Sequence, residues 1–505
     1  MKRTTAGFCA AALLLSGCSS FHPALPNAQD RLQTTRLQAA IPCGQRDNDT
    51  WQKLDACIQE TSLWNHLSQF QRIANQHPNS AGHGNRDTGT AGYKASVDYV
   101  AGLMRQAGYT VTVQQYTYTA SQVAGVPVFE TPSHAFTFER DWYAARGSGS
   151  GDVTAPIEQP ARGDGCAAGD FSGFHRGNVA LIGRGNCSFQ LQVENAQAAD
   201  AAAAVLYTPD GPAFQARLVE PATIPVIGAL SATSARELIA DSRSSAIRRV
   251  HVAVRTQSVS GTDYNLIADS PYGDANHTVV VEGHLDSIYG AGMLDNASGS
   301  TTILEIALNL AKTPTVNRLR YIWFGGEELG LLGSHYYTKH LAQAQLKQLV
   351  FDVDADVTAT PNFDIMVADP EFAWNVQRFP QNVVPQSRLG NDLFADFFAT
   401  SGVVSRNAWF GNDGTDSNSF SLVGVPNTGI LTQQECCKHA WETKLWGGFL
   451  GNYEGKIPSF NGGCVDTPDR WCDNLSNNDP FILELTSKAT AFVTFSLANN
   501  AGLGR

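Results

Sequence analysis

A repeat of short apolar runs and helical patterns, beginning near residue 266, is the feature that most constrains how this chain folds. Residues 279–281 are three consecutive valines, a run that is typical of a strand buried on both faces of a sheet. Apolar residues then recur at helical spacing over 303–308. Further strands are predicted over 319–324, 349–356 and 365–367. Because strands alternate with helices, the sequence predicts a three-layer α/β/α sandwich with a mainly parallel central sheet.

The chain on both sides of this repeat is expected to belong to the same domain. Apolar spacing predicts two helices over 63–73 and 93–104, and Gly108 is expected to end the second of them. Near the other end of the chain, Asp479 is suited to cap a helix whose first residue is Pro480.

The composition and pattern change over residues 121–265, where short β-branched runs are broken by Gly and Pro and an Ala-rich helix is expected near 193–204. This stretch reads as an insertion. We therefore expect one α/β domain over 61–120 and 266–505, interrupted by a smaller β-rich domain over 121–265.

The N-terminus predicts export. A basic start precedes a short apolar stretch over 6–15, which is too brief to cross a bilayer and is typical of a secretory signal. Residues 15–19 resemble a bacterial lipobox, in which the cysteine, here Cys18, is lipidated and becomes the first mature residue. We expect residues 1–17 to be removed and 18–60 to form a polar, irregular tether and N-terminal extension. Lipid at Cys18 would anchor the protein to the cell envelope, at the outer membrane or facing the periplasm, unless it is released.

The cysteine count agrees with export. Of ten cysteines, Cys9 lies in the signal and Cys18 at the lipid site, which leaves eight in an oxidising compartment. Proximity in the sequence suggests the pairs Cys43–Cys57, Cys166–Cys187 and Cys464–Cys472, and leaves the neighbours Cys436 and Cys437 for a vicinal bridge.

Composition excludes several classes of protein. With 43% hydrophobic and 16% charged residues, the chain has the composition of a folded protein. The net charge of -12 opposes attraction to phosphate backbones, so nucleic acid is not an expected partner. No continuous apolar run of about 18 residues follows the signal, which excludes several membrane spans.

Acidic residues and one histidine follow the predicted strands of the α/β domain. In open α/β sheets ligands bind at the carboxyl ends of strands, so these side chains are expected to share a crevice. Crowded carboxylates repel one another unless protons or cations lie between them, and a histidine with carboxylates suits zinc. A carboxylate between two ions is typical of two-metal hydrolases. The candidate residues are His284, Asp286, Asp295, Glu327, Glu328 and Asp356.

Each candidate also has a structural interpretation. A single histidine after a strand is more often a hydrogen-bonded structural residue, and paired glutamates can cap a helix. Strand alternation places Asp352, Asp354 and Asp356 on one face, but only Asp356 lies at the end of its strand, so it is the preferred ligand. No structural role accounts for acids at three successive strand ends, and this favours the metal site.

Motifs around these candidates resemble those of the secreted bacterial co-catalytic di-zinc aminopeptidases. Relatives of that family include glutamate carboxypeptidase, the transferrin receptor and glutaminyl cyclase. The motifs are His284-Leu-Asp286-Ser287, Asp295-Asn296-Ala-Ser-Gly299, Gly326-Glu327-Glu328-Leu-Gly330 and Thr415-Asp416-Ser-Asn-Ser-Phe420. Within the insertion, Asp164-Gly165-Cys166 and Gly183-Arg184-Gly185-Asn186-Cys187 resemble the protease-associated domain, a small β-rich module.

The resemblance implies a role for each candidate ligand. His284 and Asp356 would hold one zinc ion, Glu328 would hold a second, and Asp295 would bridge the two. Asp286 would orient the His284 ring, as metal-bound imidazoles generally require. Two Zn²⁺ ions are therefore the expected cofactors.

One departure from the family pattern weakens the second site. The family's fifth ligand is a histidine in a Tyr-His pair three residues before a cysteine, and here Asp469 and Pro468 stand at those two positions. Asp469 can complete the Glu328 side of the site with a carboxylate, and His439 is a less favoured alternative donor. Gly414 stands where some relatives carry an arginine. We expect the ion on the Glu328 side to be held more weakly than the other ion.

The resemblance also implies the reaction. Glu327 would be the general base that deprotonates a metal-bound water and the acid that protonates the leaving amine. The chain would then be a zinc-dependent exopeptidase, most specifically an aminopeptidase that releases N-terminal residues from peptides. Two alternatives stay open: a carboxypeptidase or glutaminyl-cyclase-like enzyme on the same scaffold, and a surface binding protein without catalysis.

Overall fold

The structure is a computed structural model. It describes residues 42–504, except for 133, 135, 139, 186, 210–212, 214, 217, 219, 244–248, 374–378, 411–413, 435 and 455–471. The predicted signal, lipid site and tether before residue 42 lie outside the described residues, as do Pro468 and Asp469.

A large sheet of eight strands has the spatial order β1-β8-β10-β9-β11-β14-β12-β13. Its strands are β1 (Thr110–Val123), β8 (Thr256–Asp269), β9 (Asp274–His284), β10 (Asn317–Phe324), β11 (Leu349–Ala355), β12 (Met366–Ala373), β13 (Arg406–Phe410) and β14 (Asn427–Leu431). The central strands β10, β9, β11 and β14 are parallel, and so are β12 and β13. Antiparallel pairs join β1 to β8, β8 to β10 and β14 to β12. The central sheet is therefore mixed, with the predicted parallel core.

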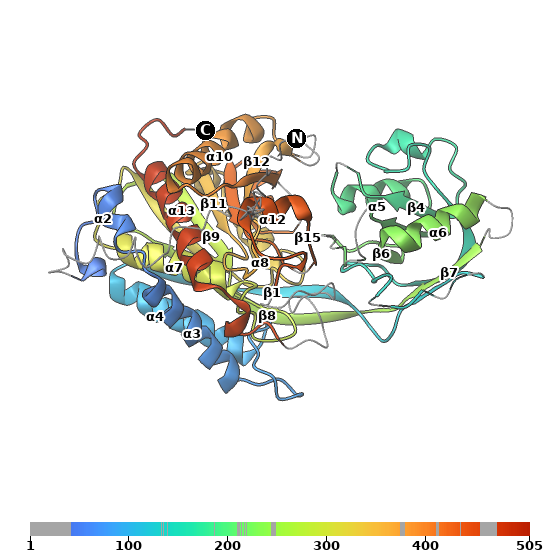
Figure 1. Ribbon diagram of the computed structural model, residues 1–505, viewed down its shortest axis with the longest axis horizontal. Helices are drawn as coiled ribbons and strands as arrows, with labels where there is room; N and C mark the ends of the chain where they lie inside the picture. The colour runs from blue at the N-terminus through green and yellow to red at the C-terminus, as the bar shows by residue number, and fades with distance from the viewer. Residues whose placement is uncertain are drawn as a thin grey trace, which may run out of the picture. The chain divides into compact units, whose positions relative to one another are not determined.

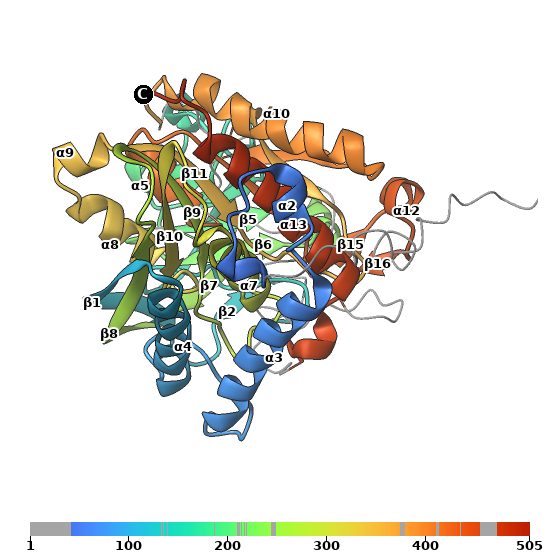
Figure 2. The same ribbon diagram turned by 90° about the vertical axis from the view of Figure 1, so that its left-hand side faces the viewer.

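Helices cover both faces of this sheet, which confirms the α/β/α sandwich. Val279 and Val281 face one apolar core and Val280 faces the other, because successive side chains of a strand point to opposite faces. Figures 1 and 2 draw α3, α4, α7 and α13 together on the first face. The helices of this face are α3 (Glu60–Gln76), α4 (Ala91–Ala107), α7 (Ala297–Leu310), α10 (Val383–Ser401) and α13 (Pro480–Ala498), and those of the second face are α8 (Leu332–His340) and α11 (Ser417–Leu422). The short helix α9 (Gln343–Leu346) follows α8.

Local signals set the ends of two of these helices as predicted. Gly108 ends α4 with φ 104°, a left-handed conformation that costs glycine little. The carboxylate of Asp479 accepts the backbone N–H groups of Phe481 and Ile482 at the start of α13. By length and composition α13 is apolar enough to cross a membrane, but Leu483 and Val493 are fully buried in the core, so it is the core helix of a folded domain.

A second sheet of six strands lies in the stretch predicted to be an insertion, in the order β2-β7-β3-β4-β5-β6. Its strands are β2 (Val128–Glu130), β3 (Gly151–Glu158), β4 (Val179–Gly183), β5 (Ala203–Tyr207), β6 (Val226–Leu230) and β7 (Arg249–Val254). Helices α5 (Phe189–Ala198) and α6 (Ala232–Arg243) accompany it, and two separate apolar cores form around it. The long antiparallel pair of β1 and β8 leads into this part of the chain and out of it, from Thr110 opposite Asp269 to Val123 opposite Thr256.

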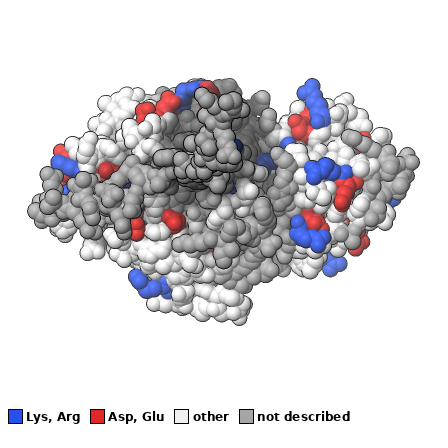
Figure 3. All heavy atoms as spheres, viewed as in Figure 1, with Lys and Arg blue, Asp and Glu red and all other residues white. Residues whose placement is uncertain are grey.

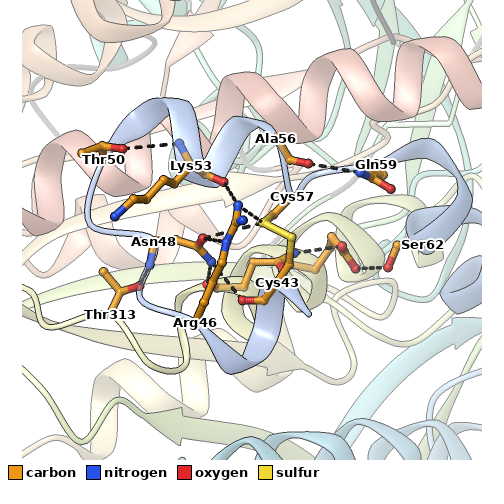
Figure 4. Close-up of a disulfide and its surroundings, with 12 residues drawn as sticks. Cys43, Arg46, Asn48, Thr50, Lys53, Ala56, Cys57, Gln59, Ser62 and Thr313 are labelled. Carbon is orange, nitrogen blue, oxygen red and sulfur yellow. Dashed lines mark hydrogen bonds between the residues drawn. A yellow bond between two sulfur atoms is a disulfide. The ribbon is translucent and has the colours of Figure 1, made fainter. Parts of the chain in front are cut away.

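The N-terminal extension is more ordered than expected. We predicted an irregular segment up to residue 60, but residues after 42 form a 3₁₀ turn, η1 (Cys43–Gln45), and the helix α2 (Trp51–Asp55), as Figure 4 shows. Leu54 and Ile58 are fully buried in the main core. Asn48 donates its backbone N–H to the Thr313 hydroxyl at 2.9 Å. The prediction was wrong because it weighed polar composition and overlooked two apolar residues one helical turn apart.

Two predicted disulfides are confirmed. Cys43 is bonded to Cys57, and Cys166 to Cys187. Cys472 also takes part in a disulfide, while its predicted partner Cys464 lies outside the described residues. The side chains of Cys436 and Cys437, in β15 (Cys436–Lys438), are likewise outside what the structure describes, so the vicinal bridge stays a prediction.

The remaining short elements are α12 (Ala440–Trp446), β16 (Gly451–Asn452) and the 3₁₀ turns η2 (Ala168–Phe171) and η4 (Leu475–Asn477). Figure 3 shows one face of the molecule, where Lys and Arg side chains are interspersed with Asp and Glu. Exposed ion pairs such as Arg176 with Asp200, at 2.9 Å, are typical of such a mixed surface. Each contributes little to stability, on the order of 0–1 kcal/mol.

Candidate metal centre

The predicted site residues come from the carboxyl ends of three adjacent parallel strands. His284 is the last residue of β9, at the centre of the sheet. Glu327 and Glu328 follow β10 on one side, and Asp356 follows β11 on the other. Asp295 lies just before α7, which begins at residue 297. Because the three strands are parallel neighbours, their ends meet at one edge of the sheet.

Three of these side chains converge on one point. The Nε2 atom of His284 lies 2.9 Å from an oxygen of Asp295 and 3.3 Å from an oxygen of Asp356. One ligand atom from each residue falls within 4.8 Å of the other two. Across the described part of the chain, this is the one group of three or more His, Cys, Asp or Glu side chains that meets that distance. The imidazole nitrogen and the two carboxylates thus form a compact donor set.

The electrostatics of this group favour a cation. Burial alone would lower the pKa of His284, but the negative charges of Asp356 and Glu327 together with hydrogen bonds to Asp286 and Asp295 raise it well above its ordinary value. The His284 side chain is only 2% exposed, so water screens these charges little. Nitrogen and oxygen donors in this combination suit zinc. The residues present therefore fit the metal that the sequence predicted.

The carboxylate of Asp286 contacts the backbone of the two glutamates as well as the histidine ring. The Nδ1 atom of His284 lies 3.1 Å from the main-chain oxygen of Asp286 and 3.5 Å from its carboxylate. The same carboxylate accepts the backbone N–H groups of Glu327 at 3.2 Å and Glu328 at 3.3 Å, and the Thr88 hydroxyl at 2.7 Å. Burial alone would raise the pKa of Asp286, but these contacts and His284 lower it. Asp286 therefore links the imidazole to the turn that carries both glutamates.

Two cavities reach the site, and the paired glutamates line different ones. Glu327 lines a cavity of about 240 Å³ together with Asp295 and Asp356. Its other walls combine apolar side chains with polar ones, the apolar from Val357, Met366, Ala368, Ala408, Ile430 and Leu431 and the polar from Asp354, Thr415, Ser417, Gln433 and Gln434. Glu328 instead lines a larger cavity of about 560 Å³. Glu327 therefore borders the cavity that Asp295 and Asp356 share, and the adjacent Glu328 borders the larger cavity.

The other acids of the third strand are placed differently. Asp352 is fully buried and Asp354 nearly so, and burial raises the pKa of both well above the ordinary value. Asp354 accepts a hydrogen bond from the Thr415 hydroxyl and lines the smaller cavity with Gly414. Asp356 alone among the three lies against His284.

Sequence reasoning missed two residues that fix the loop between His284 and Asp295. The guanidinium of Arg86, fully buried, donates to three main-chain oxygens at 2.6–2.7 Å, those of Leu285, Ala291 and Gly292. The carboxylate of Asp473 accepts the backbone N–H groups of Leu294 at 2.8 Å and Asp295 at 3.1 Å. Both residues lie about 180 or more positions from the loop and bind its backbone, so no spacing pattern in the loop points to them.

Arg86→Met is expected to lower the free energy of unfolding by roughly 3 kcal/mol, because it leaves three buried carbonyl groups without a donor, each costing about 1 kcal/mol or more. Urea unfolding followed by fluorescence measures this change. Arg72→Met, at an exposed arginine of α3 that contacts Gln69, is the matched control and should change stability little. Equal effects of the two substitutions would show that the loop does not depend on Arg86.

The chain is similar to known peptidases in sequence. The family model described as peptidase family M28 matches residues 265–446, and the PA domain model matches residues 151–238. An aminopeptidase of Pseudomonas aeruginosa is 32% identical over 465 residues, which cover 87% of this chain and 81% of that protein. A probable lipoprotein aminopeptidase of Mycobacterium tuberculosis, LpqL, is 30% identical over 80% of this chain and 81% of its own length.

The fold is also similar to that of solved structures. The aminopeptidase from Aneurinibacillus sp. strain AM-1 superposes with a TM-score of 0.63 at 20% identity, over 90% of this chain and 97% of that chain. A zinc aminopeptidase from Bacillus subtilis has a TM-score of 0.52 at 21% identity, over 88% of this chain and 96% of that one. At these identities the likeness concerns the fold alone.

Proposed function

This chain belongs to peptidase family M28, and from that premise we propose that it is an exported zinc aminopeptidase that removes N-terminal residues from peptides. The convergence of His284, Asp295 and Asp356 beside a cavity that Glu327 also lines is the observation that carries the proposal. The relatives that match most of the chain at 30% identity or more bear the name aminopeptidase.

His284, Asp295 and Asp356 would hold one zinc ion, and Glu328 with Asp295 would hold a second. Zinc bound there would supply Lewis acidity, which lowers the pKa of water and polarises a peptide carbonyl. Asp469 lies outside the described residues, and we keep it as the proposed partner of Glu328 on the second side.

Glu327 would move the proton. Its carboxylate would accept a proton from the attacking water and deliver it to the amine of the departing peptide. The backbone N–H of Glu327 donates to the carboxylate of Asp286, which also contacts the His284 ring. Asp286 therefore helps to position both the proposed base, Glu327, and the proposed metal ligand, His284. This arrangement supports the general-base role that the sequence predicted.

The 240 Å³ cavity would receive the side chain of the N-terminal residue. Its apolar walls, built from β12, β14 and their neighbours, would favour a side chain such as that of leucine or methionine. A peptide whose first residue fills this cavity would bring its first carbonyl group near Glu327, Asp295 and Asp356, which line the same cavity. Cleavage would then release one residue at a time.

The proposal is tested by assaying purified protein, treated with chelator and then reloaded with zinc, on blocked and unblocked peptides. We expect release of N-terminal leucine or methionine from free peptides, loss of activity with chelator, and no cleavage when the N-terminus is acetylated. Cleavage from the carboxyl end, or cyclisation of N-terminal glutamine, would favour one of the alternative enzymes on this scaffold. Absence of zinc binding and of every activity would favour a binding protein.

Export is supported by the disulfides Cys43–Cys57 and Cys166–Cys187, because such bonds persist outside the reducing cytosol. The relative from Mycobacterium tuberculosis bears the name lipoprotein. We propose that Cys18 carries a lipid that anchors the enzyme to the cell envelope. Mass spectrometry of the mature N-terminus would detect it.

A further inference from the structure

We propose that Arg146, supplied by the inserted domain, limits how tightly Glu328 holds a cation and so sets the occupancy of the second metal position. This inference rests on the proposed function, since it assumes that Glu328 is a metal ligand. It adds a residue from outside the peptidase domain to the determinants of the metal site.

Arg146 reaches Glu328 across a long distance in the sequence. Its Nη1 atom donates to a carboxylate oxygen of Glu328 at 3.0 Å and to the main-chain oxygen of the same residue at 3.0 Å. The side chains are 14% and 1% exposed, so the ion pair is largely shielded from water. Both residues line the larger cavity of about 560 Å³. A positive charge therefore lies directly on the carboxylate that would bind the second ion.

The guanidinium is held in place by its own domain. Its Nε atom donates to the side-chain oxygen of Gln215 at 2.7 Å, and Gln215 in turn donates to the main-chain oxygen of Ala144 at 3.1 Å. The backbone of Arg146 is bonded on both sides, to Ala216 at 2.9 Å and to Leu218 at 3.0 Å. The guanidinium carbon also lies 5.9 Å from the centre of the Tyr289 ring. An arginine fixed in this way loses little freedom when it pairs with Glu328.

A fixed positive charge at this position opposes metal binding in two ways. The carboxylate of Glu328 shares its negative charge with the guanidinium and becomes a weaker donor. A divalent ion beside Glu328 is also repelled by Arg146, and in a largely buried site this repulsion is screened less than in water. The other acids of this cavity, Asp87 and Glu220, already have hydrogen-bond partners. Asp87 accepts from the Ser287 hydroxyl at 3.0 Å, and Glu220 accepts from the Lys339 ammonium group at 3.3 Å.

The effect is expected to be selective. Arg146 contacts Glu328, whereas the His284, Asp295 and Asp356 group borders the other cavity. Removing the arginine should therefore tighten one ion and leave the other unchanged. Coupling between two binding events is reciprocal, so a cation bound at Glu328 should weaken the contact between Arg146 and the peptidase domain by the same factor.

The test is a zinc titration of metal-free full-length protein in competition with a chromophoric chelator. Arg146→Gln is expected to tighten the weaker zinc affinity about tenfold, equivalent to ~1.4 kcal/mol, with the tighter affinity unchanged. Arg146→Lys should lie between wild type and Arg146→Gln, because it keeps the charge but loses the contact with Gln215. Arg140→Gln, at an exposed arginine of the same domain that pairs with Asp141, is the matched control and should behave as wild type.

The outcomes separate the two proposals. If wild type and Arg146→Gln show the same weaker affinity, or if both bind a single ion, the role of Arg146 is overturned while the enzyme assignment stands. A second ion that appears only in Arg146→Gln supports it, provided that Glu328→Gln in the same background removes that ion. If wild type binds no zinc at all, the proposed function itself fails. Circular dichroism of each variant before titration establishes that it is folded.

Discussion

Glu327→Gln is expected to lower kcat for an N-terminal leucine peptide by about a thousandfold and to leave zinc content unchanged. The substitution keeps the size of the side chain and the backbone N–H bond to Asp286, but it removes the carboxylate that is proposed to accept a proton. General acid–base catalysis contributes roughly 10²–10⁴-fold to enzymatic rates, and here one carboxylate would act in both directions. Steady-state kinetics and metal analysis of the same preparation measure both quantities.

The matched control is Glu371→Gln, which neutralises an exposed glutamate of β12 that pairs with Arg388. It should retain wild-type kcat. Turnover within tenfold of wild type in Glu327→Gln would remove Glu327 from the proposed role. Loss of zinc together with activity would instead make Glu327 a ligand or a support of one.

Asp295→Asn is expected to remove zinc and to lower kcat/KM by about a thousandfold or more. Asp295 approaches the His284 Nε2 atom more closely than Asp356 does, at 2.9 Å against 3.3 Å, and it is the residue proposed to bridge both ions. An amide oxygen carries no charge to balance a divalent cation, so both positions lose affinity.

Thermal unfolding separates this effect from a folding defect. A ligand that binds only the folded state stabilises it by about 2.7 kcal/mol at a concentration 100 times its Kd. Zinc should therefore raise the Tm of metal-free wild type but not that of Asp295→Asn. Asp98→Asn, at an exposed aspartate of α4, is the control and should respond as wild type. An equal rise in Asp295→Asn would show that zinc binds elsewhere.

The parts of the fold that the sequence predicted are those with local signals. Alternation over Val279, Val280 and Val281 sorts their side chains onto two faces, and this depends on the strand alone. Gly108 and the Asp479 cap act on their nearest neighbours in the chain. Site residues at strand ends could be proposed for the same reason, since parallel neighbours bring such ends together.

What the sequence did not predict depends on pairs that are distant along the chain. Arg86 binds backbone oxygens, which every residue carries, so nothing in the loop from Leu285 to Gly292 marks it as the partner. Arg146 meets Glu328 only because the inserted domain folds and presents that side chain. Asn48 donates its side-chain amide to the main-chain oxygen of Asn309 in α7, 261 positions away in the sequence, so no pattern near Asn48 points to this contact.

The pairing of β1 with β8 has a consequence for how such a chain is assembled. Val123 and Thr256 are cross-strand partners, and Ala124 donates to the Arg255 oxygen at 2.7 Å, so the points where the inserted domain starts and finishes are neighbours. A short hairpin turn would join them without changing the order of the large sheet. Removing residues 124–255 and closing the chain in this way would therefore leave both long strands complete.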